Sequence, residues 1–295
     1  MTAFSEKKIE RLIKLSIGNA RLPDTFIPWE EEATQEDKFL PEHLVSLYGH
    51  PLYDQLSADQ KRELGRHEVV QVMYSYAWSE NLACLFFTRH LLELDLTSVE
   101  YRFLLRELIE EYQHQEMFSK VIIKMDGKPL RPSWIHRIVA NFTASYFPAD
   151  FIFMSVLAVE MIADTYGKII RRDKSVYNVL RKVSELHNIE EGRHIHYTKM
   201  WLDRFTKKAG LLKRTLYSMV IMINIFFMRS LYVRQEIFES IGVEQPEKYL
   251  KAARKNYKEN FANLCLDEAI EFTEEIGGFN RFTRFMWRRV LKAKI

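Results

Sequence analysis

The sequence predicts an all-α protein, built on a four-helix bundle with additional helices before and after it. Its 295 residues include only 10 glycines and 8 prolines, about half of average usage, which disfavours a turn-rich β-sandwich or barrel. Apolar residues make up 47% of the chain, enough to bury a sizeable core. Helical capping patterns recur along the chain and no low-complexity linker interrupts it, so we expect one domain over residues 1–295.

The N-terminal arm covers residues 1–56. An amphipathic pattern predicts one helix over about residues 5–18. The Pro- and acid-rich stretch that follows predicts an irregular segment that wraps around the protein. No chemistry is visible in this arm.

Capping boxes predict the first two helices of the bundle, which spans residues 57–209. In such a box, two side chains three residues apart satisfy each other's free backbone N–H groups. Ser57 with Gln60 begins a helix that extends to Leu94, and Thr97 with Glu100 begins a second one. The second helix is expected to stop at Asp126-Gly127, with the glycine in the left-handed conformation.

Prolines and glycines divide the rest of the chain. Three helices are expected to complete the bundle region, over about residues 133–145, from Pro148 to Arg172, and from the turn at residues 173–175 to Lys208. The C-terminal helices, residues 210–295, are expected over 211–241 and 246–275, with a basic helix after Gly277-Gly278.

Charge and cysteine usage exclude several classes of protein. The formal net charge is only +3, so we expect no nucleic-acid partner. Cys84 and Cys265 lie far apart in apolar helical patterns, which indicates reduced thiols in a core rather than a disulfide or a thiolate metal site. The charged N-terminus does not look like a secretory signal, so the cytoplasm is the expected location.

One apolar segment raises the question of a membrane. Leu216 to Met228 is nearly all apolar but shorter than the roughly 20 residues that a spanning helix needs. We therefore expect a buried core or dimer-interface helix, and membrane contact is the less favoured alternative.

Two E-x-x-H motifs carry the chemistry. Glu111 and His114 lie in one predicted helix, and Glu191 and His194 lie in another. A step of three residues keeps both side chains on one helix face, so each pair can hold a metal ion through an oxygen and a nitrogen. A single motif of this kind is weak evidence, because such pairs also occur on solvated faces.

The spacing of two further glutamates strengthens the case. Glu80 precedes Glu111 by 31 residues, and Glu160 precedes Glu191 by the same number. In an antiparallel hairpin, residues equidistant from the turn lie at the same height. The midpoints fall beside Asp95 and Ser175, where helix boundaries are already expected. Each lone glutamate should therefore lie beside an E-x-x-H motif.

Two such hairpins facing each other supply the ligand set of ferritin-like carboxylate-bridged dimetal proteins. His187 lies on the same stripe as Glu191 and His194, at i, i+4 and i+7, and is expected as a further ligand, with a satisfied core histidine as the alternative. Four carboxylates balance two divalent ions. Ligands without thiolate suit iron, with manganese possible, so we expect two Fe ions per chain and O2 as co-substrate.

Three more carboxylates near the motifs have expected positions. Glu110 and Glu190 point about 100° away from the ligands, either into solvent or toward the ligand side chains. Asp164 follows Glu160 by one turn and is expected to orient a ligand histidine through its second N–H, with a Lys or Arg partner away from the metal as the alternative.

Small residues beside the glutamates suggest where a substrate binds. Ala83 and Cys84 follow Glu80, and Ala163 and Gly167 follow Glu160. They either leave a cavity beside the metal or permit close helix packing.

The ligand candidates, in this order, resemble the di-iron arylamine oxygenases typified by p-aminobenzoate N-oxygenase. The resemblance covers roughly residues 60–205, and its most specific element is H-x-x-x-E-x-x-H in HNIEEGRH. It implies a homodimeric cytosolic enzyme that oxidises an amine nitrogen to hydroxylamine or nitro, with electrons from an external donor. The substrate-anchoring residues of the family cannot be placed on this sequence, so p-aminobenzoate itself is not implied.

Other functions remain open at this point. Within the same enzyme class, the alternative is a di-iron hydroxylase or desaturase of an aliphatic or acyl substrate. Lipid contact by residues 211–241 and by the basic end RFTRFMWRRVLKAK would favour it. Iron storage would share most of these ligands but usually uses a shorter chain and a cage. A metal-free helical interaction protein would have no use for seven ligands.

Overall fold

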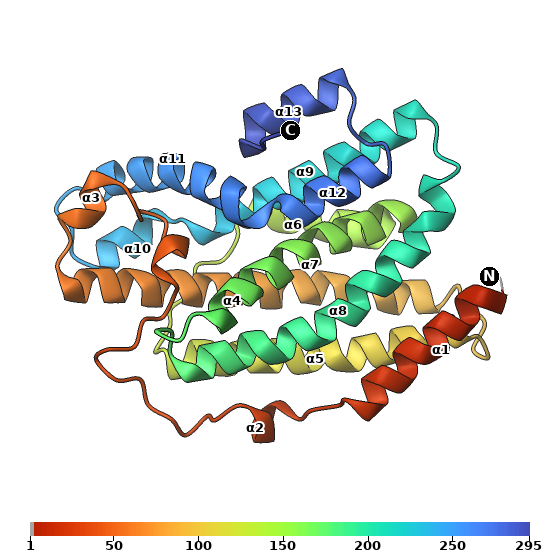
Figure 1. Ribbon diagram of the computed structural model, residues 1–295, viewed down its shortest axis with the longest axis horizontal. Coiled ribbons are helices and arrows are strands. Elements are labelled where there is room, and N and C mark those ends of the chain that lie inside the picture. The colour runs from red at the N-terminus through yellow and green to blue at the C-terminus, as the bar shows by residue number, and fades with distance from the viewer. Residues whose placement is uncertain (1–2) are drawn as a thin grey trace.

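Four long helices form the centre of the computed structural model, which describes residues 3–295. They are α4 (Ala58–Leu91), α5 (Val99–Lys124), α7 (Ala149–Arg172) and α8 (Asn178–Thr206). Helix α4 packs against α5 and α7 against α8, and the two hairpins face each other as a bundle (Figure 1). The expected all-α, ferritin-like helical fold is confirmed.

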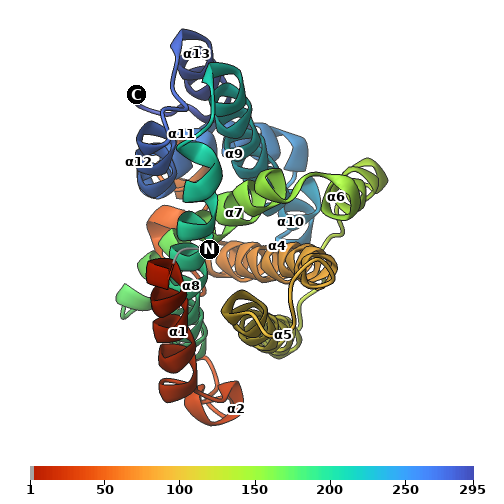
Figure 2. The same cartoon turned by 90° about the vertical axis from the view of Figure 1, so that its right-hand side faces the viewer.

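The remaining helices surround this bundle. Helix α1 (Ala3–Gly18) packs on α5 and α8, and the arm after it contains α2 (Pro23–Phe26), a 3-10 turn (Glu42–Leu44) and α3 (Pro51–Asp54). Helix α6 (Trp134–Tyr146) contacts α4 and projects from one side of the molecule (Figure 2). Helix α9 (Leu211–Tyr232) lies across α7 and α4.

The two N-terminal caps of the first hairpin have different outcomes. The capping box of Ser57 with Gln60 is present and begins α4. The second prediction is off by one residue, because Ser98 caps α5 by accepting from the backbone N–H of Tyr101. Thr97 instead donates its N–H and hydroxyl to Asp95, which closes the turn before the helix.

The end of α5 also differs from the expectation. Asp126 takes the left-handed conformation, with φ 46°, and Gly127 does not. Gly127 is needed for a different reason. A Cβ at this position would lie 2.7 Å from a methyl carbon of Val70, so a side chain there would collide with α4.

The C-terminal region contains two helix breaks that the sequence pattern missed. The segment 211–241 is divided into α9 and α10 (Gln235–Ser240), and the segment 246–275 into α11 (Pro246–Cys265) and α12 (Asp267–Glu275). Neither break contains Gly or Pro. Val233 and Leu266 lie at the breaks and are buried, so tertiary packing rather than local propensity ends these helices. The basic helix α13 (Arg281–Leu291) follows as expected.

The apolar segment is longer than its sequence core indicates. The stretch Leu211–Ser240 is long and apolar enough to cross a membrane by length and composition alone, so the expectation that it is too short is wrong. However, 56% of its most apolar window is buried inside the protein, as in the core helix of a soluble protein. Burial, not length, therefore favours a core role for α9.

Candidate metal centre

The two hairpins bring all seven predicted ligands to the middle of the bundle. Six of them are buried, and the side chain of Glu80 is 12% exposed. Helices α4 and α7 each contribute one glutamate, and α5 and α8 contribute the two E-x-x-H motifs and His187. The helices supplying these residues are α4 for Glu80, α5 for Glu111 and His114, α7 for Glu160, and α8 for His187, Glu191 and His194.

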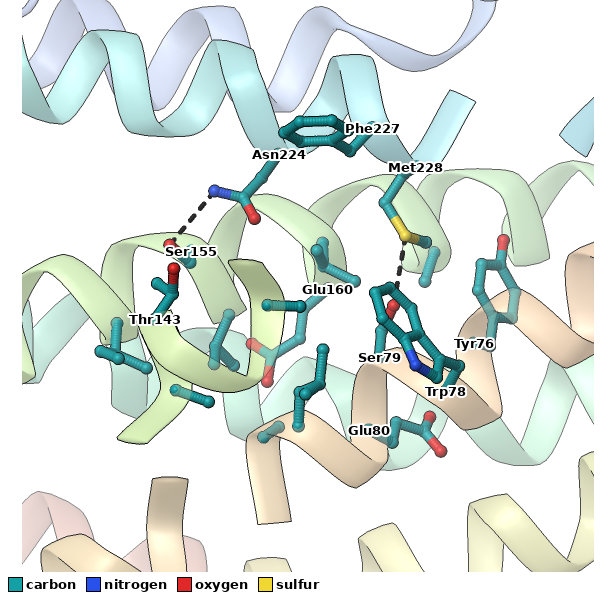
Figure 3. A pocket seen from close by; sticks show the side chains of 18 of the residues that line it. Tyr76, Trp78, Ser79, Glu80, Thr143, Ser155, Glu160, Asn224, Phe227 and Met228 are labelled. Carbon is teal, nitrogen blue, oxygen red and sulfur yellow. Dashed lines mark hydrogen bonds between the residues drawn. The ribbon is translucent and has the colours of Figure 1, made fainter. Parts of the chain in front are cut away.

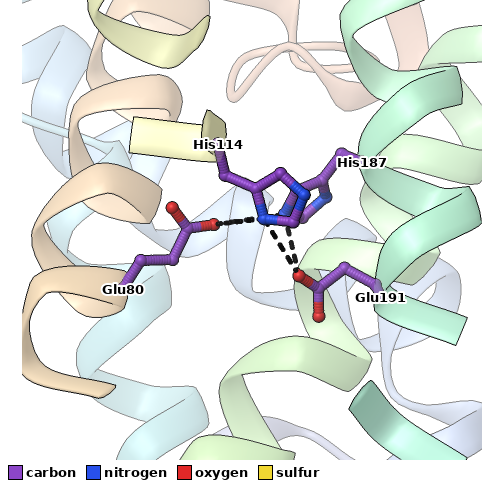
Figure 4. Close-up of side chains that lie close together, drawn as sticks. All are labelled: Glu80, His114, His187 and Glu191. Carbon is purple, nitrogen blue, oxygen red and sulfur yellow. Dashed lines mark hydrogen bonds and ion pairs between the residues drawn. The ribbon is translucent and has the colours of Figure 1, made fainter. Parts of the chain in front are cut away.

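One group of four side chains forms a first candidate metal position (Figure 4). Glu80, His114, His187 and Glu191 each place one ligand atom within 4.8 Å of the others. The Nδ1 atom of His114 lies 3.6 Å from Oε1 of Glu80 and 3.5 Å from Oε1 of Glu191. The Nε2 atom of His187 lies 3.3 Å from the same oxygen of Glu80. One ion between these atoms can contact two imidazoles and two carboxylates.

A second candidate position lies beside the first. His194 Nδ1 lies 3.2 Å from Oε1 of Glu111 and 3.5 Å from Oε1 of Glu191. The same histidine also groups with Glu160 and Glu107 within 4.8 Å. Glu191 belongs to a group on each side, so its carboxylate can bridge two ions.

Glu107 is a candidate ligand that the sequence reasoning missed. Its side chain is fully buried, and neither of its carboxylate oxygens has a hydrogen-bond partner. It lies on α5 four residues before Glu111 and seven before His114. This spacing repeats that of His187 with Glu191 and His194 on α8. The same i, i+4, i+7 pattern is present in both helices, so the sequence does contain the signal for Glu107.

Glu107 and His187 occupy equivalent places in the two halves of the bundle. His187 of α8 meets Glu80 of α4 and His114 of α5 in the first position. Glu107 of α5 meets Glu160 of α7 and His194 of α8 in the second. The first position is thus richer in imidazole and the second richer in carboxylate.

Two buried glutamates orient the E-x-x-H histidines. The Nε2 atom of His114 lies 2.8 Å from Glu190 of the opposite hairpin, and the Nε2 atom of His194 lies 2.8 Å from Glu110. A proton on Nε2 leaves the Nδ1 lone pair facing the cluster, which is what a metal ligand requires. Glu110 and Glu190 are therefore not solvated and contact the ligands instead.

Glu110 is held in its charged form. Burial alone would raise the pKa of this carboxyl, but His194, the hydroxyl of Ser16 at 2.6 Å and Arg193 at 2.7 Å lower it to about 2. A charged acceptor strengthens the hydrogen bond from His194 and raises the basicity of that ligand.

Asp164 does not have the role expected for it. It pairs with Lys168 one turn later on α7, and its Oδ1 accepts from Nδ2 of Asn188 at 2.9 Å. The alternative of a cationic partner away from the metal is the correct one. The histidine-orienting role belongs to Glu110 and Glu190, which precede the E-x-x-H glutamates by one residue.

The cluster has the donor set that a pair of cations needs. Nine buried ligand atoms lack a hydrogen-bond partner: Glu80 Oε2, both oxygens of Glu107 and of Glu160, Glu111 Oε2, Glu191 Oε2, and Nδ1 of His114 and His194. Burial and the neighbouring carboxylates raise the pKa of Glu80 and of Glu160. Buried like charges without partners are costly, and metal ions relieve that cost. Oxygen and imidazole donors without thiolate fit iron or manganese.

A cavity of about 410 Å³ adjoins the cluster. Its walls come from α4, α6, α7 and α9, and carboxylates of the cluster, Glu80 and Glu160 among them, line one side (Figure 3). Ala83 and Ala163 line it, so these small residues do leave space beside the candidate metal positions.

The other two small residues serve packing. A Cβ at Gly167 would lie 2.9 Å from Nδ2 of Asn188, so this glycine permits the close approach of α7 and α8. Cys84 accepts a hydrogen bond from Gln115 of α5 at 3.3 Å. Both Cys84 and Cys265 are buried free cysteines, as expected.

Comparison with known proteins identifies the family. The profile of the family described as p-aminobenzoate N-oxygenase AurF matches residues 3–277. The chain belongs to this family. The enzyme class of the family is that of the di-iron oxygenases, and the carboxylate and histidine cluster is compatible with its di-iron centre.

Curated relatives cover nearly the whole chain. An uncharacterised protein of Mycobacterium tuberculosis and one of Mycobacterium bovis are each 27% identical over 304 aligned positions. Each alignment covers 95% of this chain and 86% of the relative. Neither name states a substrate, so these relatives do not narrow the reaction.

Proposed function

We propose that this protein is a di-iron N-oxygenase that transfers oxygen to the amine nitrogen of a small aromatic substrate. The observation that carries the proposal is a buried cluster of five glutamates and three histidines, in a member of this family, that adjoins a cavity large enough for such a molecule. Two iron ions bound there would supply O2 activation.

The residues around the cluster have separate roles in this proposal. Glu80, Glu107, Glu111, Glu160 and Glu191 would hold the ions together with the three histidines. Glu110 and Glu190 keep Nδ1 of the paired histidines free for metal. The apolar walls of the cavity exclude water and hold the amine beside the cluster.

The overall reaction balances with an external electron donor. In the first oxidation, from amine to hydroxylamine, one atom of O2 forms the N–O bond and the other leaves as water, which consumes two electrons and two protons from outside the substrate. We propose that a separate reductant supplies these electrons.

We also propose that the protein acts as a cytoplasmic homodimer. Helix α6 exposes Trp134, Ile138 and Phe142, with exposed fractions of 63%, 60% and 55%. A second copy that covers these side chains would remove apolar surface from water. A native mass of one chain at micromolar concentration would contradict this part of the proposal.

The second candidate is a di-iron hydroxylase or desaturase of an aliphatic substrate. The apolar lining of the cavity is compatible with it, because carbon chains fit such walls as well as aromatic rings do.

One substrate separates the two candidates. The iron-loaded, chemically reduced protein is mixed with 4-ethylaniline and 18O2, with the variant His194→Ala as control. Mass spectrometry of an N-oxygenase reaction shows labelled hydroxylamine, nitroso or nitro product. Label on the ethyl carbon, or ring-ethyl desaturation, would support the second candidate, and absence of any product would contradict both for this substrate class.

A further inference from the structure

The acidic side chains that line the cavity all lie on the side of the metal cluster. They are Glu80, Glu111, Glu160 and Glu191. Among the described residues that line the cavity, none is lysine or arginine. The remaining walls are mostly aliphatic and aromatic, and their large rings are Tyr76, Trp78, Phe147, Phe151 and Phe227.

Two titratable side chains outside the cluster also line the cavity, the buried phenol of Tyr76 and the imidazole of His136. His136 of α6 places its Nδ1 atom 2.5 Å from the hydroxyl of Ser133 and packs edge-on against Phe227, with ring centroids 5.1 Å apart. The His136 ring is therefore already held by the contact of its Nδ1 atom with Ser133 and by packing against Phe227. No second cationic group of residues 3–295 lines the cavity beside it to form a site for a carboxylate.

A single amide supplies a polar anchor on the α9 wall. Nδ2 of Asn224 donates to the carbonyl oxygen of Val220 at 2.9 Å and to the hydroxyl of Ser155 at 3.1 Å. A carbonyl oxygen only accepts hydrogen bonds, so the contact with Val220 shows which amide atom of Asn224 is the nitrogen. The oxygen, Oδ1, is therefore on the other side of the amide. In the described part of the chain, no hydrogen bond ends on that oxygen, and it is turned toward the cavity (Figure 3).

From these contacts we infer that the substrate is an uncharged, largely apolar arylamine. The end of the molecule remote from the amine carries at most one hydrogen-bond donor, and Oδ1 of Asn224 accepts that hydrogen bond. A carboxylate at that end would be buried against apolar walls without a cation, which is costly. The presence of an amine in the substrate rests on the proposed N-oxygenation. The neutral, apolar character of the rest of the substrate rests on the residues that line the cavity.

Three compounds of similar size test the charge. We measure equilibrium binding of 4-ethylaniline, 4-aminobenzyl alcohol and 4-aminobenzoate to the iron-loaded protein without oxygen, by dialysis. The two neutral compounds should bind at least about 100-fold more tightly than 4-aminobenzoate. Equal or tighter binding of 4-aminobenzoate overturns the inference, and so does failure of both neutral compounds to bind. Binding of 4-aminobenzoate that disappears in His136→Ala would identify His136 as an anion partner and overturn it as well.

A variant of the amide tests the donor. Asn224→Leu keeps the size of the side chain and removes the acceptor. The dissociation constant of 4-aminobenzyl alcohol should rise about tenfold, while that of 4-ethylaniline stays within about twofold. An equal change for both compounds would show a structural role and overturn this part. Because binding is measured without turnover, a protein that binds the neutral amines but does not oxidise their nitrogen would contradict the proposed function and leave the cavity inference standing.

Discussion

The metal centre between α4, α5, α7 and α8 and the cavity between α4, α6, α7 and α9 share a wall but differ in composition. The centre brings together five carboxyl groups and three imidazoles, all of them buried except Glu80, and nine of their ligand atoms have no hydrogen-bond partner. Beyond that shared wall, the cavity is mostly apolar, with one amide as its main anchor. The centre thus determines the class of chemistry, and the cavity determines which molecule undergoes it.

This difference in composition explains why the metal centre could be predicted from the sequence and the cavity only in part. Metal ligands are a few specific residue types that must recur at fixed helical spacing, so Glu80 with Glu111-His114 and Glu160 with Glu191-His194 could be paired by arithmetic alone. Cavity walls are ordinary apolar residues from helices far apart in the chain. Ala83 and Ala163 were foreseen because they follow ligands, whereas the walls from α6 and α9 had no such marker.

The largest expected effect is loss of metal. His194→Ala removes a nitrogen from the second position and leaves Glu110 without its histidine partner. We expect at least one iron per chain to be lost, with the helical content unchanged. His90→Ala is the matched control, since it removes a half-buried imidazole from the same bundle outside the cluster. Two irons per chain in His194→Ala would contradict the ligand assignment.

Blocking the cavity should separate metal binding from turnover. Ala163→Phe fills space beside the cluster, so substrate oxidation should fall by about 100-fold or more while both irons remain bound. Ala163→Ser is the size-conserving control and should retain most activity. Turnover that survives in a folded Ala163→Phe protein would place the substrate elsewhere.

Removal of the missed carboxylate tests the second metal position. Glu107→Gln should weaken binding of one of the two irons by at least about 10-fold, measured by anaerobic titration, because it replaces a charged donor with a neutral one. Glu68→Gln is the control, since Glu68 is another buried carboxylate of the chain and lies outside the groups that can hold a metal. Unchanged affinity for both irons in Glu107→Gln would remove it from the ligand set.

Glu68 shows what burial does to a carboxylate that no metal relieves. Burial raises the pKa of Glu68 from the usual 4.5 to about 7. The hydrogen bond that Glu68 accepts from the backbone N–H of Ser46 at 2.9 Å lowers the pKa, but by less than burial raises it. The folded protein keeps this proton while the unfolded chain releases it, so the free energy of unfolding falls as pH rises from about 4.5 to about 7 and then levels.

The substitution Glu68→Gln measures how much unfolding free energy is lost because Glu68 stays protonated in the folded protein. Relative to Glu68→Gln, the wild-type protein should lose about 3 kcal/mol of unfolding free energy between pH 4.5 and 8. Chemical denaturation of both metal-free proteins at several pH values gives the difference. Parallel pH profiles would contradict the raised pKa.

The incorrect expectations have physical causes of their own. Asp164 is buried, but Lys168 one turn later neutralises it, and sequence spacing could not show which partner it prefers. Ser98 rather than Thr97 caps α5 because Asp95 already binds Thr97. The breaks after α9 and α11 occur at buried Val233 and Leu266, where only the packing of the finished protein ends the helix. By contrast, the bundle and the position of its centre followed from helical periodicity and hairpin symmetry.

Anaerobic titration of the metal-free protein with Fe(II) measures whether one chain binds a pair of metal ions. Bound iron is counted by elemental analysis after desalting, alongside the native mass. We expect two irons per chain and none beyond that number when Fe(II) is in excess. Binding of no iron or a single iron, or of many irons per chain in a large cage, would contradict it.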